Sequence, residues 1–289
     1  MTSGPAATPA PAWAWACGDR RFDLHERAQV MGVLNVTPDS FSDGGRWAEP
    51  DAALAHARSM LAEGADLLDV GAESTRPGAA AVSDDQQWAR LEPVLEPLAR
   101  EGVCLSVDTA SAAVAERALA AGARIVNDVT ALGDPAMAAV VARAGAGLVL
   151  MHMQGTPATM QDDPHYDDVG AEVAAHLLAR AAAAEAAGVR RDHIALDPGI
   201  GFGKTVAHNL TLLAGIGALA SHGYPVVVGV SRKGFLGRLT GEPVDRRVEA
   251  GLAAAAVAVF EGARIVRTHD VAATVRALRV AEALRRARA

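Results

Sequence analysis

Short apolar runs and longer alanine-rich stretches alternate along the chain from about residue 30 onward. The short runs are mostly β-branched and do not alternate with polar residues, which is the pattern of strands buried on both faces of a sheet. The predicted strands are residues 30–34, 67–70, 103–107, 125–126, 147–151, 194–196, 226–230 and 265–266. This pattern favours a parallel sheet that other elements cover on both sides.

A helix is predicted after each of these strands. The predicted helices are residues 51–63, 84–100, 111–121, 135–144, 168–187, 205–215, 245–261 and 270–288. Several begin at an acidic or hydroxyl residue that can cap a helix. Glycines that can end a helix in a left-handed conformation are Gly64, Gly102, Gly122, Gly145, Gly188 and Gly262. Eight β-then-α units in one chain predict an α/β fold, a closed (β/α)8 TIM barrel.

The alternative fold is an open, doubly wound sheet. That fold usually carries a glycine-rich dinucleotide turn after its first strand, and residues 35–38, Asn-Val-Thr-Pro, do not form one. Residues 13–29 could form a short hairpin that closes the bottom of the barrel. We therefore expect one barrel domain over residues 13–289. Residues 1–12, which are small residues and prolines, are expected to be a disordered N-terminal extension.

Composition restricts the partners and the compartment. The 289 residues are 51% hydrophobic and 4% aromatic, so the core must be aliphatic. The formal net charge is -7 and no segment is a basic stripe, which argues against nucleic acid as a partner. The longest apolar run, residues 252–260, is too short to span a bilayer. Cys17 and Cys104 give no disulfide framework, so we expect a cytoplasmic protein without membrane contact.

Polar residues follow nearly every predicted strand. They are Asn35, Glu73, Ser74, Thr75, Arg76, Asp108, Asn127, Asp128, His152, Asp197, Ser231, Arg232, Lys233, Arg267 and His269. In a TIM barrel these positions surround the C-terminal mouth, where active sites form. Any one of them could simply cap a helix, but a full rim of them indicates a binding site.

The residue types suggest what this site binds. Asp108, Asn127 and Asp197 offer acceptors and an amide, which match a flat heterocycle with a guanidine-like edge of parallel N–H donors. Lys233 could donate to carbonyl and nitrogen acceptors of the same ring.

An anionic group would suit the other side of this mouth. Arg267, His269 and Asn35 could hold it, and the Asn35 carbonyl could also ligate Mg²⁺. A heterocycle beside an anion describes an activated ester of a nucleobase-like compound.

A glycine-rich segment, residues 199–205, resembles a phosphate-binding loop but fails both common patterns. Pro198 stands where a Walker A motif needs its first glycine, and Lys204 stands where the dinucleotide motif needs its last. The histidines also lack the close spacing, with one another or with cysteine, that a zinc site needs.

Eight motifs in this order resemble the dihydropteroate synthase family. They are MGVLNVTPDSFSDGG at residues 31–45, DVGAESTRPG at 69–78, SVDT at 106–109, NDV at 127–129, MHMQG at 151–155, DPGIGFGK at 197–204, SRK at 231–233 and RTHDV at 267–271. The resemblance runs from about residue 15 to the C-terminus, and each motif falls at a predicted strand end. A chance match of all eight in order is improbable.

The resemblance implies a transferase of folate biosynthesis. Such an enzyme condenses 6-hydroxymethyl-7,8-dihydropterin pyrophosphate with p-aminobenzoate, giving 7,8-dihydropteroate and pyrophosphate. It also implies a Mg²⁺ cofactor, inhibition by sulfonamides and a homodimer. The small-molecule substrates are then the principal partners.

Roles for individual residues follow from the resemblance. The pterin would contact Asp108, Asn127, Met151, Asp197, Phe202 and Lys233. The diphosphate and Mg²⁺ would contact Asn35, Arg267 and His269, with Asn35 as metal ligand. The p-aminobenzoate would contact Thr75, Arg76, Pro77, Ser231 and Lys233. Catalytic roles would fall to Asn35, Arg76, Lys233, Arg267 and His269. Residues 37–45 and 74–78 would close over both substrates.

Two departures from the family pattern stand out, and two rival functions remain open. Ala72 replaces a usual glycine, and Gly234-Phe235-Leu236-Gly237 follows the SRK motif in place of a more polar continuation beside the acceptor site. One rival is the pterin-binding barrel of a corrinoid methyltransferase, which should lack the closing loops and the diphosphate residues. The other is a non-catalytic paralogue that binds pterin or a protein partner.

Overall fold

A computed structural model describes residues 14–37, 48–73 and 82–288 of the chain. The extension predicted at residues 1–12, most of the loop at 37–45 and the loop at 74–78 lie outside these ranges. Three of the predicted site residues, Thr75, Arg76 and Pro77, therefore lie outside the described residues.

The described part of the chain contains an eight-stranded parallel sheet. Its strands are β3 (Gln29–Asn35), β4 (Leu67–Gly71), β5 (Leu105–Asp108), β6 (Ile125–Asp128), β7 (Gly147–Met151), β8 (Ile194–Asp197), β9 (Val227–Gly229) and β10 (Ile265–Thr268). Their order is β8-β7-β6-β5-β4-β3-β10-β9. The two ends meet where Leu196 N donates to Pro225 O at 2.8 Å and Leu196 bridges Val226. The sheet is thus a closed barrel, as predicted, and not an open doubly wound sheet.

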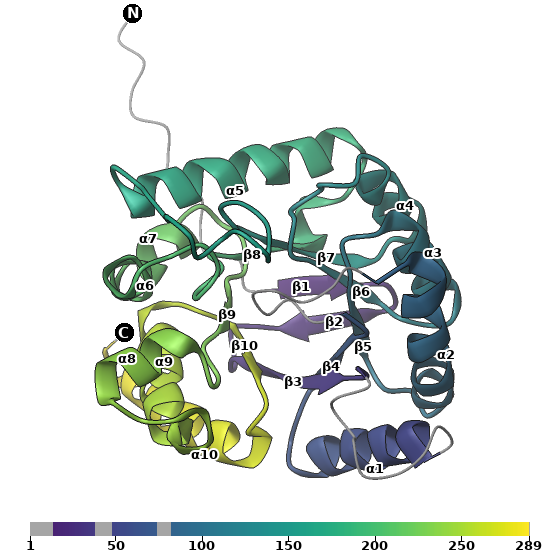
Figure 1. The fold of residues 1–289 in the computed structure, drawn as a ribbon, viewed down its shortest axis with the longest axis horizontal. Helices are drawn as coiled ribbons and strands as arrows, with labels where there is room; N and C mark the ends of the chain where they lie inside the picture. Colours follow the sequence, from purple (N-terminus) through teal and green to yellow (C-terminus); the bar gives the residue numbers. More distant parts are fainter. Residues whose placement is uncertain (1–13, 38–47, 74–81, 289) are drawn as a thin grey trace, which may run out of the picture.

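Helices surround this barrel (Figure 1). They are α1 (Ala48–Ala62), α2 (Asp84–Arg100), α3 (Ala112–Ala120), α4 (Met137–Ala144), α5 (Val169–Ala186), α6 (Val206–Ala214), α7 (Ile216–Ala220), α8 (Gly234–Thr240), α9 (Val248–Glu261) and α10 (Val271–Arg288). All eight predicted helices are present, most within two residues of the expected bounds. The pattern did not predict α7 and α8, because both are shorter than the window in which a helical period can be recognised.

The helix boundaries follow from local chemistry. Ser83 begins α2 with a capping box, and Asp168 and Thr205 accept hydrogen bonds from the first turns of α5 and α6. All six glycines predicted to follow helices have positive φ. Gly122, at φ +107°, has so little room that a β-carbon there would lie 2.7 Å from Ala99 Cβ.

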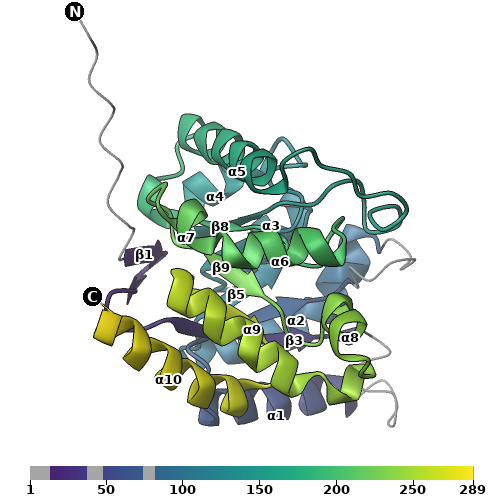
Figure 2. The ribbon, with the colours of Figure 1, turned by 90° about the vertical axis from the view of Figure 1, so that its left-hand side faces the viewer.

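A hairpin closes the bottom of the barrel, as predicted. It consists of β1 (Ala14–Cys17) and β2 (Arg20–Asp23), and Figure 2 shows it at the end opposite α8. Trp15 is fully buried, and its indole Nε1 donates to His193 O at 2.9 Å. The fit is close, because a β-carbon on Gly147 would lie 2.6 Å from Cys17 Sγ.

The barrel interior changes character from bottom to top. Alternate strand positions face inward, since successive side chains of a strand point to opposite faces. At the bottom these positions form one apolar cluster with the hairpin: Trp15, Cys17, Leu24, Met31, Leu67, Cys104, Ile125, Val149, Ala195, Val227 and Ile265. Two residues later along each strand the inward positions include Asp69, Ser106, Asn127, Asp197 and Arg267. A sealed apolar floor therefore supports a polar mouth.

A separate, aliphatic core fills the space between the barrel and its helices. Among the described residues no helix has the length and apolar character needed to cross a membrane.

One buried ion pair attaches α10 to the bottom of the barrel. Arg264 Nη1 lies 2.7 Å from Glu282 Oε1, and both side chains are only 4% exposed. Glu282 also accepts from Ala28 N at 2.9 Å and from Arg285 Nε at 3.1 Å. These contacts connect α10 to the residues that begin β3 and β10.

Replacing Glu282 with Ala should lower the free energy of unfolding by about 3–5 kcal/mol, because it removes the buried carboxylate that pairs with the buried Arg264 guanidinium. The double variant Arg264→Met/Glu282→Leu should recover most of this loss. Urea denaturation measures both. Glu101→Ala is the matched control, since its pair with Arg58 is exposed and should contribute little. A Glu282→Ala variant as stable as the control would contradict the role given to this pair.

Candidate active site

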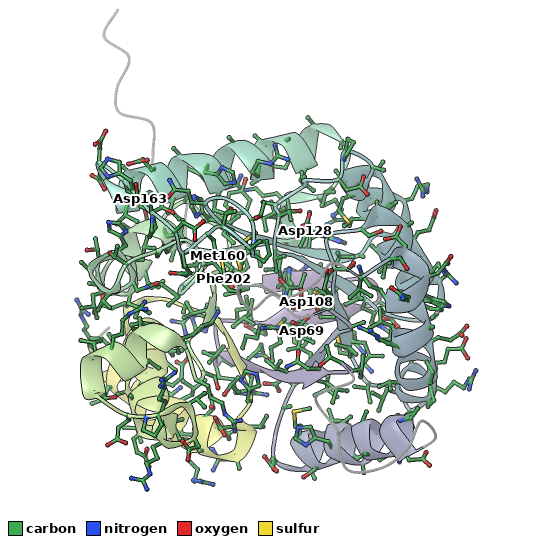
Figure 3. The ribbon with its side chains drawn as sticks, viewed as in Figure 1. Asp69, Asp108, Asp128, Met160, Asp163 and Phe202 are labelled. Carbon is green, nitrogen blue, oxygen red and sulfur yellow. The ribbon has the colours of Figure 1, made fainter. Side chains whose placement is uncertain are left out.

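An arginine between two aspartates occupies the centre of the barrel mouth. Arg267 on β10 donates from Nε to Asp69 Oδ2 on β4 at 2.6 Å and from Nη2 to Asp108 Oδ2 on β5 at 2.7 Å. Asn127 on β6 donates its amide to the same Asp69 oxygen at 3.0 Å. Figure 3 shows Asp69 and Asp108 beside each other within the ring of strands. Side chains from four strands are thus fixed by one hydrogen-bonded network.

The charges in this network influence one another because water is largely excluded. Burial raises the pKa of Asp108 to about 7, although Arg267 opposes the shift. Burial also disfavours the charge of Arg267, but Asp69 and Asp108 outweigh it and raise the pKa of the guanidinium. Arg267 is therefore a permanent cation, whereas Asp108 changes its charge near neutral pH.

Asp69 and Ser106 retain unused hydrogen-bonding capacity. Both residues are fully buried, and Asp69 Oδ1 and Ser106 Oγ have no hydrogen-bond partner among the described residues. An unpartnered buried oxygen normally costs stability. These two atoms lie on neighbouring strands, which pair Asp69 with Ser106 in register.

Lys233 and Asp197 face the same mouth from its other side. The Lys233 ammonium lies 3.8 Å from the centre of the Phe202 ring, which is a cation–π contact. Burial and the nearby Arg267 lower the pKa of Lys233 to about 7. Burial raises the pKa of Asp197, whose Oδ1 accepts from Gly199 N at 2.7 Å.

Asp197 also pairs in register with Met151 on β7. The space between the acidic network and Lys233 is therefore flanked by the aromatic ring of Phe202 and the thioether of Met151, which suits a flat ligand.

Ser231 and His269 stand together beyond Arg267. His269 Nδ1 is 3.1 Å from Ser231 Oγ, which also accepts from the His269 backbone N–H at 3.3 Å. Burial, with Arg267 and Arg232 nearby, lowers the pKa of His269 to about 4, so the imidazole is neutral at neutral pH. Arg232, at φ +59°, turns away and forms two hydrogen bonds with Asp270 at 2.6 and 3.2 Å.

Asn35 lies at the end of β3, beside the acidic network. A β-carbon on Gly71 would lie 3.4 Å from Asp108 Cβ and 3.8 Å from Asn35 Oδ1, so the amide oxygen and Asp108 flank the same glycine. Among the described residues no cluster of three histidine, cysteine or acidic side chains could hold a metal ion by itself. A cation at Asn35 would need further ligands from a substrate or from water.

Comparison with known proteins now decides the family. The family model described as "Pterin binding enzyme" matches residues 31–269. The dihydropteroate synthase of Neisseria meningitidis serogroup C is 50% identical over 276 residues, covering 93% of this chain and 97% of that protein. The Escherichia coli K12 enzyme is 46% identical over 255 residues, covering 88% and 90%. The chain belongs to the dihydropteroate synthase family.

Solved structures of dihydropteroate synthases have the same fold. The Yersinia pestis enzyme, described with a sulfonamide drug complex, has a TM-score of 0.89 at 45% identity and covers 94% of this chain and 99% of that one. The Xanthomonas albilineans enzyme with 4-aminobenzoic acid has a TM-score of 0.88 at 47% identity, covering 94% and 98%. The predicted TIM barrel and the predicted family are therefore both confirmed.

Membership in the dihydropteroate synthase family fixes the reaction. The protein is a transferase of folate synthesis that joins a dihydropterin pyrophosphate to p-aminobenzoate and forms 7,8-dihydropteroate. This agrees with the predicted activity and not with the corrinoid methyltransferase barrel.

The structure brings most of the predicted synthase residues to one mouth. They are Asn35, Asp108, Asn127, Met151, Asp197, Phe202, Ser231, Lys233, Arg267 and His269, and their individual roles stay predictions. Sequence reasoning missed Asp69 as a site residue, although it stands as a lone charge in the buried run Leu-Leu-Asp-Val at residues 67–70. That position was the available signal, since a buried carboxylate requires a partner. The partner of Asp69 is Arg267, which is distant in sequence and was predicted only to bind the diphosphate.

Ionisation within the synthase mouth should make pterin binding depend on pH. Affinity for the dihydropterin alcohol should rise as pH increases through the pKa of Asp108, because its predicted role is to accept a hydrogen bond as a carboxylate. It should fall as pH increases through the pKa of Lys233, because its predicted role is to donate as an ammonium. Both values lie at about 7, so calorimetry should show a narrow maximum near neutral pH.

Two variants separate the limbs of this profile. Asp108→Asn should weaken and shift the low-pH limb, because Asp197, whose pKa burial also raises, remains as an acceptor. Lys233→Arg should remove the high-pH limb. A wild-type affinity that stays flat across neutral pH would show that these two groups do not control binding.

Proposed function

We propose that the mouth is divided into a pterin slot, a diphosphate site and an acceptor site. Asp108, Asn127, Asp197 and Lys233 form the pterin slot, with Met151 and Phe202 along its sides. The observation that supports this most directly is the Asp69–Arg267–Asp108 network, which fixes acceptors on one side of the mouth while Lys233 supplies a donor on the other.

Pterin recognition follows from hydrogen-bond complementarity. The 2-amino and ring N–H groups of a pterin form a guanidine-like donor edge, which a carboxylate can accept with two parallel bonds. Asp197 can do this, because Gly199 uses only its Oδ1 among the described contacts. Lys233 donates to the ring carbonyl and ring nitrogen acceptors, while Asp108 and Asn127 meet the remaining polar edge.

The diphosphate site lies where Asn35, Arg267 and His269 converge. Arg267 supplies a permanent positive charge, and His269, although neutral, still carries one ring N–H for a phosphate oxygen. The Asn35 amide oxygen beside Asp108 suits Mg²⁺, which commonly takes few protein ligands and completes its shell with substrate phosphates and water. When bound, Mg²⁺ would supply charge neutralisation to the leaving diphosphate.

The chemical step is a substitution at the pterin methylene. An arylamine is a weak nucleophile, so the electrophile must be activated, and the dihydropterin ring can stabilise a cation at its exocyclic carbon. Arg267 and His269 stabilise the departing diphosphate, and the carboxylates of Asp108 and Asp197 offset positive charge that develops on the ring. Catalysis therefore combines electrostatic stabilisation with positioning and needs no covalent intermediate on the protein.

The acceptor site belongs beside Ser231 and Lys233. Thr75, Arg76 and Pro77 lie outside the described residues, so their part is carried over from the family motif. Arg76 would bind the carboxylate of p-aminobenzoate. Phe235, two residues after Lys233, is buried in the core between the barrel and its helices. Sulfonamides, which carry the same aniline, should compete for the acceptor site.

A turnover assay tests the reaction as a whole. Purified protein with dihydropterin pyrophosphate, p-aminobenzoate and Mg²⁺ should release 7,8-dihydropteroate, and a sulfonamide should inhibit competitively against p-aminobenzoate. Pterin binding without product would instead identify a non-catalytic paralogue.

The pterin and diphosphate roles should separate by mutation. Asp197→Ala should weaken binding of the dihydropterin alcohol and of its pyrophosphate alike, by about 2–4 kcal/mol, because it removes a paired charge-assisted contact. His269→Ala should weaken the pyrophosphate by about 1.5–3 kcal/mol and leave the alcohol unchanged. Calorimetry with both ligands gives the comparison. Equal losses for both ligands in His269→Ala would place that residue in the pterin slot.

Asn35→Ala should reduce the dependence of diphosphate binding on Mg²⁺. In the wild type, Mg²⁺ should tighten binding of inorganic diphosphate, and the variant should show little difference with and without the metal. Asn127→Ala is a suitable comparison, since it changes an amide in the same mouth on the pterin side. A Mg²⁺ effect that survives unchanged in Asn35→Ala would assign the metal to other ligands.

A homodimer in the cytoplasm completes the proposal. Val257 on α9 and Val280 and Leu284 on α10 are large apolar side chains that are more than half exposed. Arg288 contacts Phe260 and Glu261, so these two helices run together to the bottom of the barrel. This exposed apolar face is where a second copy would pack, and sedimentation analysis would measure the association.

A further inference from the structure

Two loops pack back to back beside the proposed pterin slot. Residues 152–168 follow β7, residues 198–205 follow β8, and His152 N donates to Asp197 O at 3.0 Å where the two diverge. A β-carbon on Gly199, at φ +67°, would lie 1.8 Å from His152 O. One on Gly203, at φ +59°, would lie 2.7 Å from Gln154 O. The two loop backbones therefore touch, and glycine is required at both contacts.

A fully buried lysine joins these two loops. Lys204 has no exposed surface, and its Nζ lies 3.0 Å from His152 Nδ1, 2.8 Å from Phe202 O and 3.3 Å from His152 O. Three acceptors match the three hydrogens of an ammonium group. Tyr166 adds a second connection, because its hydroxyl donates to Gly203 O at 2.8 Å.

Burying this lysine is costly, so its presence needs a reason. Burial lowers the pKa of Lys204 to about 7, and the charge of Asp197 opposes that shift. An apolar residue of similar length would fill the same space without the desolvation cost. What an apolar residue cannot provide is the set of hydrogen bonds to His152 and Phe202.

Phe202 connects Lys204 to the mouth. Its backbone carbonyl accepts from Lys204, while its ring faces the Lys233 ammonium at 3.8 Å. Gly201 touches the same Lys233 side chain, since a β-carbon there would lie 3.0 Å from Lys233 Cδ. Figure 3 shows Phe202 on the side of the mouth toward β8. The position of the loop thus determines where the Lys233 ammonium lies.

We propose that Lys204 is a positioning residue for pterin binding, which fixes Phe202 and through it the Lys233 ammonium without contacting either substrate. The inference rests on the proposed pterin slot. It predicts that the loss of Lys204 weakens the pterin step more than the acceptor step, because the pterin slot uses both Phe202 and Lys233, whereas Ser231 of the acceptor site is held separately by His269.

Methionine and glutamine at position 204 provide a matched pair. The two side chains have the same length, but only glutamine can donate hydrogen bonds. Lys204→Met should raise the Kd for the dihydropterin alcohol at least about tenfold, as expected when charge-assisted hydrogen bonds are lost. Lys204→Gln should recover part of this loss, and in both variants KM for p-aminobenzoate should rise by a smaller factor than the pterin Kd.

A double-variant cycle tests the route through Phe202. If Lys204 acts by placing Phe202, then Lys204→Met adds little further loss in a Phe202→Ala background. Glu282→Gln is the control for lost stability, because it weakens the barrel far from the mouth. It should change the pterin Kd and KM for p-aminobenzoate by similar factors. Circular dichroism checks that each variant is folded, and Lys204→Gln keeps the comparison available should Lys204→Met fail to fold.

Three results would overturn the proposal. Pterin affinity in Lys204→Met within about twofold of wild type would show no positioning effect. Equal fold increases in the pterin Kd and in KM for p-aminobenzoate, as expected for a destabilised barrel, would show a purely structural role. Multiplicative losses in the double variant would exclude Phe202 as the route. Failure of the pterin slot itself would appear separately, as unchanged pterin affinity in Asp197→Ala.

Discussion

The interaction on which the mouth depends is the burial of one guanidinium between two carboxylates at the centre of the barrel. Three charged groups lose their hydration there. The short hydrogen bonds from the guanidinium to both carboxylates offset this desolvation cost. Asp69, Asp108 and Arg267 come from three different strands, so these hydrogen bonds also connect β4, β5 and β10 across the barrel. The contact with Arg267 opposes the rise in the pKa of Asp108 that burial causes, which favours the carboxylate form that can accept from a ligand.

The contrast between the two ends of the barrel follows from the strand period. Most of the strands contribute an inward apolar residue near their start and an inward polar residue near their end, as in Leu67 and Asp69 or Ile265 and Arg267. The apolar layer needs a cover, and the hairpin provides it with Trp15. The polar layer must stay open to admit substrate. Function therefore lies at the end where burial is incomplete.

Much of this arrangement could be predicted from the sequence. Unalternating β-branched runs separated by capped, alanine-rich helices determine a parallel barrel, and the polar residue after each run marks the mouth. Asn127, Asp197 and Lys233 were identified in this way. Family motifs then supplied roles that residue type alone leaves open, such as a metal ligand at Asn35.

The remainder depends on distances that no local pattern encodes. Asp69 was missed because its partner is 198 residues away, and Lys204 was noticed only as a residue that breaks a phosphate-loop motif. Its actual contacts arise from the packing of two loops. The short helix α8 was missed because seven residues give too little periodicity. In each case the deciding information is tertiary.

The hairpin has a consequence for how the chain acquires its shape during synthesis. Trp15 is synthesised well before its hydrogen-bond acceptor, the backbone carbonyl of His193, which lies 178 residues later in the chain. The pairing of β3 with β10 waits even longer, until residue 268 has emerged. Contacts of such long sequence separation form slowly, because a large loop must close before they form. The large apolar side chain of Trp15 must therefore remain without its final partner until His193 has been synthesised. During this interval a chaperone or a transient cluster of helices and strands would protect it.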